Sequence, residues 1–474
     1  MRPHIPLPAK LRPSLTSPSS IEAMPYPSPS RDIKELDDRQ DALLSIPSSS
    51  SGYGTTQQYK VYKRRWLGII MLIVMNIVVS WGWLTYAPVS NLSKEWFSLE
   101  SETPINWLST IIFFSYVVAT PAVVYGLHHY SLKPTLLLAS FLLLAGNWIR
   151  YGGTKTQSFP VVMLGQILIG FSQPFVLSAP PHYSDLWFTP NGRVSATAVV
   201  SLANPVGAAL AQFLGPMLAT TAEDIPFMVL VVSIIATVSV FGWLLFPSSP
   251  PTPPSASGSQ RKASVAETKK VLENNRNFWL MLVLFSIYLG LFNAFTSLLN
   301  QIMFPRGYSP DQAGICGAIL ILSGLISTAV VSPVIDRTHA YFLAMRFFVP
   351  MIGAAYVAFI WAPEGGRILA PYIVGALLGA ASFCLMPLAL ELSVEFTYPV
   401  APEWSSSALW CGGQLMGAVL LLVMDRMKDE KGDMRTALIF QGVLAAAAVP
   451  GVFLFRKEGG LRRLEEDKRM GGDC

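Results

Sequence analysis

A charge-free apolar segment runs from Trp66 to Tyr86, and a cluster of four cations directly precedes it. As a helix rising about 1.5 Å per residue, this segment is long enough to cross a hydrocarbon core of about 30 Å. Basic residues beside a span favour the cytosolic face of the membrane. The cations are Lys60, Lys63, Arg64 and Arg65. We therefore expect a membrane-spanning helix whose N-terminal end lies in the cytosol.

Further apolar runs of similar length follow the first one. Helices satisfy their backbone hydrogen bonds internally, so such runs predict transmembrane helices. The twelve runs span residues 66–86, 105–127, 134–149, 159–179, 194–219, 226–246, 278–304, 312–335, 342–362, 368–392, 404–424 and 436–455. Because 52% of the residues are hydrophobic and 13% are charged, we expect an all-α, multi-pass integral membrane protein.

A long polar segment divides the apolar runs into two sets of six. It begins with a proline-rich stretch and ends with a basic one. The predicted parts are a disordered cytosolic N-terminal tail (1–61), a six-helix lobe (62–246), a cytosolic linker (247–277), a second six-helix lobe (278–455) and a cytosolic C-terminal tail (456–474). Lys and Arg are more frequent in the segments that this topology places in the cytosol, which supports the orientation.

The two halves of the chain are related by an internal repeat. A shift of 210 residues aligns Asn204 with Gln414, and Trp83 with Asn293. Parallel repeats of six-helix halves are typical of two-lobed transporters. Recurrence of small residues wherever membrane helices pack closely is the alternative explanation. We favour duplication because polar residues also coincide.

Polar and aromatic side chains within the runs are the candidates for binding a solute, because such groups in a membrane face protein or a water-filled cavity. They are Asn76, Trp83, Tyr86, Gln166, Gln173, Asn204, Asn293, Ser297, Gln301 and Gln414. The set contains no cation that would clamp an anion, so it favours a neutral or cationic solute. The alternative roles are interfacial anchoring for Tyr86 and helix–helix hydrogen bonding for single amides.

No pattern typical of catalysis is recognisable. The sequence has no phosphate-binding loop, no metal-ligand spacing and no nucleophile elbow. We therefore expect a protein that is not an enzyme and has no catalytic residue, metal site or cofactor. Its expected partners are a small-molecule substrate and the lipid bilayer but no nucleic acid, and we expect a monomer.

Several sequence stretches resemble a known family. They are INWLS at Ile105, NPVG at Asn204, EDIPFM at Glu223, LLNQI at Leu298 and LALELSVEFTYPV at Leu388. Together they resemble the major facilitator superfamily and, within it, the feline leukaemia virus subgroup C receptor-related (FLVCR-like) transporters, most of all their less characterised branch. The resemblance implies twelve helices in two six-helix lobes, alternating access, and cargo such as choline, ethanolamine or haem.

The resemblance also carries residue roles. Trp83 stands at the place of the family's first-span Trp, and Gln173 and Gln414 at the places of its binding amides. Asn293 replaces the seventh-span aromatic residue of the family's cage for the ammonium group. That replacement weakens the expectation of choline itself.

A cytosolic gate is predicted from charges near the span ends. The superfamily's charged motif between spans two and three is absent, whereas the loop after span eight keeps an acid and a base. The candidates for the gate are Asp185, Arg193, Asp336 and Arg337. A solvated loop charge, worth under about 1 kcal/mol, is the alternative for each of them.

The function that these features favour is facilitated, uniporter-like transport of a small organic solute, in the plasma membrane rather than a vacuolar or lysosomal one. A proton-coupled exporter of a vitamin-like amine from an acidic organelle is the first alternative, and it would use Glu391 and His182. A membrane receptor or sensor derived from a transporter, with the N-terminal tail as its signalling arm, is the second.

Overall fold

The computed structural model describes residues 62–129, 132–188, 190–245, 275–338, 340–397, 402–429 and 432–455. All of these belong to the single unit Gln58–Cys474. The predicted N-terminal and C-terminal tails and nearly all of the predicted linker lie outside the described residues.

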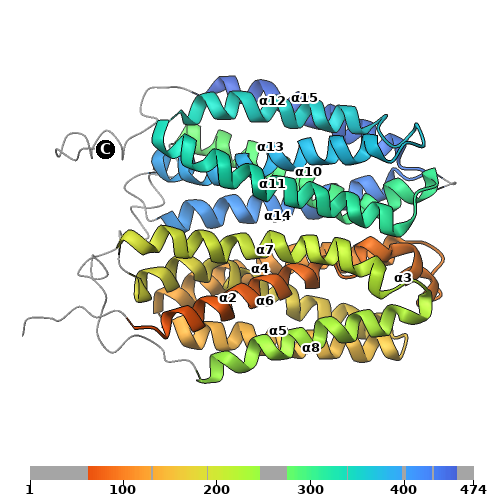
Figure 1. Cartoon of the computed structure of the whole chain (residues 1–474), viewed down its shortest axis with the longest axis horizontal. Helices are drawn as coiled ribbons and strands as arrows, with labels where there is room; N and C mark the ends of the chain where they lie inside the picture. The colour runs from red at the N-terminus through yellow and green to blue at the C-terminus, as the bar shows by residue number, and fades with distance from the viewer. Residues whose placement is uncertain are drawn as a thin grey trace, which may run out of the picture. The chain divides into compact units, whose positions relative to one another are not determined.

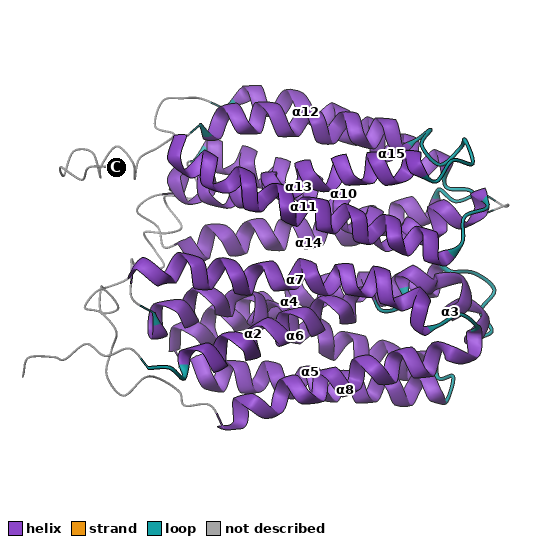
Figure 2. Ribbon diagram, in the orientation of Figure 1, coloured by secondary structure: helices purple, strands orange, loops and turns teal. Residues whose placement is uncertain are grey.

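The first half of the described chain, which we call the N lobe, contains six long helices (Figures 1 and 2). Three short helices lie between them. In chain order the elements are α2 (Arg65–Leu84), η1 (Ala87–Val89), α3 (Ser90–Trp96), α4 (Thr103–His129), α5 (Leu132–Lys155), α6 (Phe159–Trp187), α7 (Pro190–Leu218), η2 (Ala222–Asp224) and α8 (Ile225–Leu245).

The second half, the C lobe, again contains six long helices. In chain order its elements are α10 (Arg276–Met303), η4 (Phe304–Arg306), α11 (Pro310–Thr338), α12 (Tyr341–Phe359), α13 (Leu369–Thr397), α14 (Pro402–Arg426), α15 (Arg435–Ala448) and η5 (Val449–Leu454). Twelve segments of the described chain are long and apolar enough to cross a membrane, which confirms the predicted all-α membrane fold.

The helix bounds follow the 210-residue repeat. Helix α6 begins at Phe159 and α13 at Leu369, while α8 begins at Ile225 and α15 at Arg435. Glycines at equivalent places hold equivalent helix pairs together. A Cβ on Gly207 of α7 would lie 2.2 Å from the Ile77 carbonyl oxygen of α2, and one on Gly417 of α14 would lie 3.1 Å from the Asn293 side chain of α10.

The two lobes meet along α4 with α14 and along α7 with α11. In Figure 1, α4 and α7 lie on the side of the N lobe that faces α11 and α14. The Gln212 side chain of α7 donates a hydrogen bond of 2.8 Å to the Thr296 carbonyl of α10. A Cβ on Gly314 of α11 would lie 2.2 Å from the Gln212 carbonyl oxygen, so this contact needs a glycine.

Candidate functional site

Three of the predicted binding residues carry buried polar atoms that have no hydrogen-bond partner in the described part of the chain. They are the Trp83 Nε1, the Gln173 Oε1 and the Ser297 Oγ. Their side chains are 7%, 3% and 1% exposed and belong to α2, α6 and α10. A buried polar group without a partner is costly, and more so in a membrane. These atoms are therefore candidates for bonding to water or to a bound solute.

An amide pair lies on the C-lobe side of the candidate site. The Asn293 Nδ2 of α10 donates to the Gln414 Oε1 of α14 at 3.0 Å. Both residues are buried, at 5% and 4% exposure. One amide hydrogen bond leaves each side chain with further donor or acceptor capacity, which a polar solute can use.

Trp83 lies on the N-lobe side, near the end of α2. Its ring centroid is 5.4 Å from that of Phe113 in α4, with the planes inclined by 58°. The Ser109 hydroxyl donates to the Trp83 carbonyl at 3.4 Å. The indole thus belongs to an aromatic pair, and its N–H is still available to a ligand.

A cation missed by the sequence analysis lies inside the N lobe. Arg150 of α5 is fully buried, and it directly follows the predicted apolar run that ends at residue 149. Its Nη1 donates to the Gly82 carbonyl at 3.0 Å and to the Thr85 hydroxyl and the Gln166 Oε1 at 3.1 Å, and its Nη2 donates to the Asn147 Oδ1 at 2.8 Å. The guanidinium thus bonds at the end of α2 to residues on either side of Trp83, namely Gly82 and Thr85.

Four other predicted residues make hydrogen bonds inside the N lobe. Gln166 accepts from Arg150 and donates to the Leu108 carbonyl at 3.0 Å. The Tyr86 hydroxyl bonds to the Thr154 hydroxyl at 2.7 Å. Asn76 donates to Leu72 of its own helix, and its carbonyl accepts from Asn204 at 3.4 Å. The bonds of Gln166 and Asn204 match the helix-to-helix alternative for single amides, and a contact with solute stays a prediction for all four residues.

Gln301, also a predicted binding residue, joins the two lobes instead. It exchanges two hydrogen bonds with Asn106 of α4, one of 3.1 Å from the Asn106 Nδ2 and one of 2.6 Å from the Gln301 Nε2. The Asn106 Nδ2 also donates to the Asp425 Oδ1 of α14 at 2.6 Å. These bonds lie at the end of the lobes where α2 and α10 end and α4 begins, which the predicted topology places outside the cell.

Charged residues extend this inter-lobe network. The Lys428 Nζ lies 2.8 Å from the Glu102 Oε2, 2.7 Å from the Gln301 Oε1 and 4.0 Å from the Asp425 Oδ1. The Asn300 Nδ2 donates to the Ser90 hydroxyl and to the Asn91 Oδ1. We call this set the external network; it consists of Ser90, Asn91, Glu102, Asn106, Asn300, Gln301, Asp425 and Lys428.

The four residues predicted to form the cytosolic gate have side chains outside the described part of the structure. The backbones of Asp185, Arg193, Asp336 and Arg337 lie in helices α6, α7 and α11. Their roles stay predictions. Of the two residues named for proton coupling, Glu391 is exposed and His182 is half-buried.

Most of the external network and Arg150 escaped the sequence analysis for one reason. Each residue missed lies at a span boundary, where an apolar window stops at the first charged or polar group. The run ending at residue 149 continues as helix α5 to Lys155, and Asp425 directly follows the run that ends at residue 424. The INWLS stretch held the available signal, because its Asn106 is the second residue of the apolar run 105–127.

The sequence was then compared with known proteins. Residues 67–409 match the Major Facilitator Superfamily. The chain is 30% identical over 379 residues to "Solute carrier family 49 member A3" of Danio rerio, covering 78% of this chain and 80% of that protein. It is 25% identical over 399 residues to "Choline/ethanolamine transporter FLVCR2" of Homo sapiens, covering 81% of this chain and 76% of that protein.

Solved structures share the fold at low sequence identity. A bacterial homolog of the human lysosomal transporter Spinster, inward-facing and unoccupied, superposes with a TM-score of 0.69 at 14% identity, covering 86% of this chain and 99% of that one. A D-xylose–proton symporter superposes with a TM-score of 0.64 at 12% identity, covering 83% of this chain and 98% of that one.

Proposed function

Because this chain belongs to the major facilitator superfamily and, within it, to the family of solute carrier family 49 member A3, we propose that it carries a small organic amine of the choline and ethanolamine class. The chain is a multi-pass membrane transporter and not an enzyme. The proposed class follows the printed names of relatives such as the human FLVCR2 protein. Haem has less support, since none of these names mentions it.

The observation that carries the proposal is the make-up of the candidate site. Trp83, Gln173 and Ser297 have buried polar atoms without partners in the described part of the chain, and Asn293, one helical turn before Ser297 on α10, forms an amide pair with Gln414. An indole face attracts an ammonium group by about 2 kcal/mol when both are desolvated. Hydroxyls and amides bond the alcohol or amine at the other end of such a solute.

The buried cation does not favour an organic anion as cargo. The two terminal nitrogens of Arg150 donate to four acceptors of its own lobe, whereas its Nε has no hydrogen-bond partner among the described residues. An anion that bound the terminal nitrogens would have to displace these bonds, each worth about 1.5–3 kcal/mol because the donor is charged. A neutral or cationic solute needs no such rearrangement.

We further propose that the external network is the outer gate of an alternating-access cycle. Its bonds join α4 of the N lobe to α10 and α14 of the C lobe at one end of the molecule. A carrier must break such bonds to open toward that side, and it re-forms them when it opens toward the other. The structure then corresponds to a state closed on the outside.

Facilitated transport is the simpler coupling for this site, because none of the five candidate residues titrates. A proton-coupled cycle is the second candidate, and one observation favours it: Asp425 is only 6% exposed and accepts from Asn106. Asp425→Asn keeps the shape of the side chain but removes the carboxylate. Uptake that follows a pH gradient in the wild type and loses that dependence in Asp425→Asn would establish coupling.

The location of the protein is proposed as the plasma membrane and its state as a monomer. Uptake assays in whole cells require that the protein lies in the plasma membrane, so surface biotinylation should be used to measure its surface level in the same cells. A protein confined to internal membranes would require the same assays on isolated vesicles.

The experiment that tests the proposal is uptake of radiolabelled choline and ethanolamine by cells that express the wild type, Trp83→Phe or Trp107→Phe. Trp83→Phe keeps an aromatic ring and removes the N–H, and we expect about tenfold weaker apparent affinity. Trp107 is 37% exposed and stacks on Phe114, so its variant is the matched control and should behave as the wild type. Absence of saturable uptake of both compounds at a verified surface level would contradict the proposal.

A further inference from the structure

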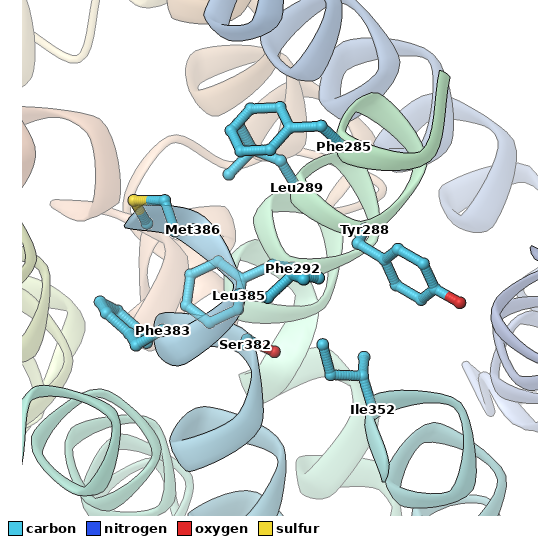
Figure 3. Close-up of a pocket in the computed structure, with 9 residues that line it drawn as sticks. All are labelled: Phe285, Tyr288, Leu289, Phe292, Ile352, Ser382, Phe383, Leu385 and Met386. Carbon is cyan, nitrogen blue, oxygen red and sulfur yellow. The ribbon is translucent and has the colours of Figure 1, made fainter. Parts of the chain in front are cut away.

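A small cavity lies inside the C lobe, between α10, α12 and α13 (Figure 3). About 30 Å³ of it is accessible to the centre of a water molecule. Since a water needs about 10–15 Å³ of such space, the cavity has room for about two waters or a short alkyl group. Its lining residues are Phe285, Tyr288, Leu289, Phe292, Ile352, Ser382, Phe383, Leu385 and Met386.

The lining favours an apolar occupant over water. Tyr288 presents only its ring, because its hydroxyl points away in Figure 3 and donates to the Ala445 carbonyl at 2.9 Å. Phe292 and Phe383 meet edge to face, with ring centroids 5.4 Å apart. The Ser382 hydroxyl is the remaining polar group among the lining side chains. A buried water needs two to four polar partners, which this lining does not supply.

The cavity adjoins the candidate site along α10. Phe292 directly precedes Asn293, and Leu289 lies one helical turn before it, on the same face. Leu289 also packs on α14, where a Cβ on Gly413 would lie 2.3 Å from the Leu289 side chain, next to Gln414. Three lining residues are only half-buried, and they mark the mouth: Leu289, Ser382 and Met386.

The equivalent place in the N lobe does not repeat this cavity lining. In the 210-residue register Phe292 corresponds to Gly82, whose carbonyl accepts from Arg150. Ile352 corresponds to Leu142, and Phe383 to Gln173. The aromatic pair that lines the cavity in one lobe is therefore matched by a glycine and an amide in the other. A solute held between the lobes would therefore meet an apolar cavity beside the Asn293–Gln414 pair on its C-lobe side.

We propose that this cavity receives an apolar substituent of the transported amine, so that the preferred substrate is an amphiphilic amine larger than choline. The inference rests on the proposed function, since it extends the same site. The polar head binds at Trp83, Gln173 and the Asn293–Gln414 pair, and the apolar arm passes between Leu289 and Ser382 to lie against Phe292 and Phe383.

The test is a chain-length series in competition with radiolabelled choline. The competitors are choline and its analogues in which one N-methyl group is replaced by N-propyl or N-hexyl. Two added methylenes entering a dry cavity should lower the half-inhibitory concentration about tenfold. The hexyl analogue should gain nothing further over propyl, because the cavity is short. Equal inhibition by choline and the propyl analogue would overturn the inference while leaving the proposed function intact.

A cavity-filling variant makes the test specific to this place. Ser382→Leu adds volume at the mouth of the cavity. In this variant the propyl analogue and choline should have about equal half-inhibitory concentrations. Ser382→Ala removes only the hydroxyl and should keep the wild-type ratio of these concentrations, and Ala354→Leu, at an exposed position of α12, is the matched small-to-large control. A propyl preference that survives in Ser382→Leu, or affinity that keeps rising to hexyl, would place the apolar arm elsewhere, as on a lipid-facing groove, and would overturn the inference.

Binding to the purified full-length protein separates the two proposals. Thermal stabilisation by the same three compounds, in lipid nanodiscs, does not require transport. Stabilisation by the propyl analogue that Ser382→Leu abolishes would support the cavity even if choline is not carried. If none of the three compounds stabilises the protein or competes for uptake, both proposals fall.

Discussion

The N lobe and the C lobe have the same arrangement of long helices, but they differ in the side chains that pack between those helices. In the N lobe a buried arginine and its amide and hydroxyl partners lie between α2, α5 and α6. The register positions of Asn147, Arg150 and Gln166 are Val357, Ile360 and Ala376 in the C lobe. Aromatic rings pack in the C lobe instead. The ring centroid of Phe295 lies 4.7 Å from that of Phe359 and 5.9 Å from that of Tyr356.

The difference shows that the repeat preserves the close contacts between helix backbones, whereas the polarity of the core side chains is not preserved. Gly207 and Gly417 occupy equivalent places and seat equivalent helix pairs, although the lobes to which they belong differ in the side chains of their cores. A polar core fixes directions through hydrogen bonds. The candidate site therefore combines an N-lobe side next to a hydrogen-bonded core with a C-lobe side where the Asn293–Gln414 pair adjoins an apolar cavity.

The largest effect is expected from removing the buried cation. Arg150→Met leaves the Gln166 Oε1 and the Asn147 Oδ1 without their described donor, which should cost about 3 kcal/mol or more. Ile360→Met, at the equivalent place in the C lobe, is the matched control and should cost under about 1.5 kcal/mol. The measurement is the apparent Tm of the purified proteins. Equal destabilisation by the two variants would remove the distinction between a polar and an apolar core.

Adding a methyl group at the two equivalent glycines should sharpen the comparison. Gly207→Ala places a Cβ 2.2 Å from a backbone oxygen, whereas Gly417→Ala meets the Asn293 side chain at 3.1 Å. Backbone cannot yield as a side chain can, so we expect about 1–3 kcal/mol from Gly207→Ala and less from Gly417→Ala. Tm reports the first effect. Gly417→Ala should instead change the apparent KM, because it displaces the Asn293–Gln414 pair; a larger Tm loss in Gly417→Ala would contradict this account.

A smaller effect is expected where the lobes join. Lys428→Met removes charged bonds to Glu102 and Gln301, and should weaken the outside-closed state by about 1.4 kcal/mol. Opening is read from labelling of Ser109→Cys by a membrane-impermeant thiol reagent, in a protein without its native cysteines, and the rate should rise about tenfold. Arg435→Met is the control, because Arg435 pairs with Glu364 inside the C lobe. An unchanged labelling rate would mean that Lys428 is not part of a gate.

The smallest effect should come from Tyr86→Phe. The variant removes the bond between the Tyr86 and Thr154 hydroxyls inside the N lobe, at a cost of about 1 kcal/mol. We expect a modest fall in Tm and an unchanged apparent KM. A raised KM at unchanged Tm would show instead that Tyr86 touches the solute, as the sequence pattern predicts.

The spans and the repeat were predictable from the sequence, because both depend on local composition. An apolar run of sufficient length must form a helix in lipid, and the residue types at Asn204 and Gln414 carry the 210-residue register without any knowledge of packing. The membrane-buried polar residues were predictable as a set. The role of each of these residues was not predictable. Gln166 makes its hydrogen bonds within the N lobe, Gln301 makes them between the lobes, and Gln173 has an oxygen without a hydrogen-bond partner.

The sequence by itself determined which segments cross the membrane, that two similar halves exist, and that few charges lie within them. The tertiary structure decided which polar groups meet, since partners such as Asn106 and Gln301 come from opposite lobes and Arg150 meets Gln166 of a neighbouring helix. It also decided where an apolar cavity remains beside Asn293. The physical reason is that helix formation follows from each segment's own backbone and hydrophobicity, whereas hydrogen-bond pairing and packing depend on how distant segments face one another.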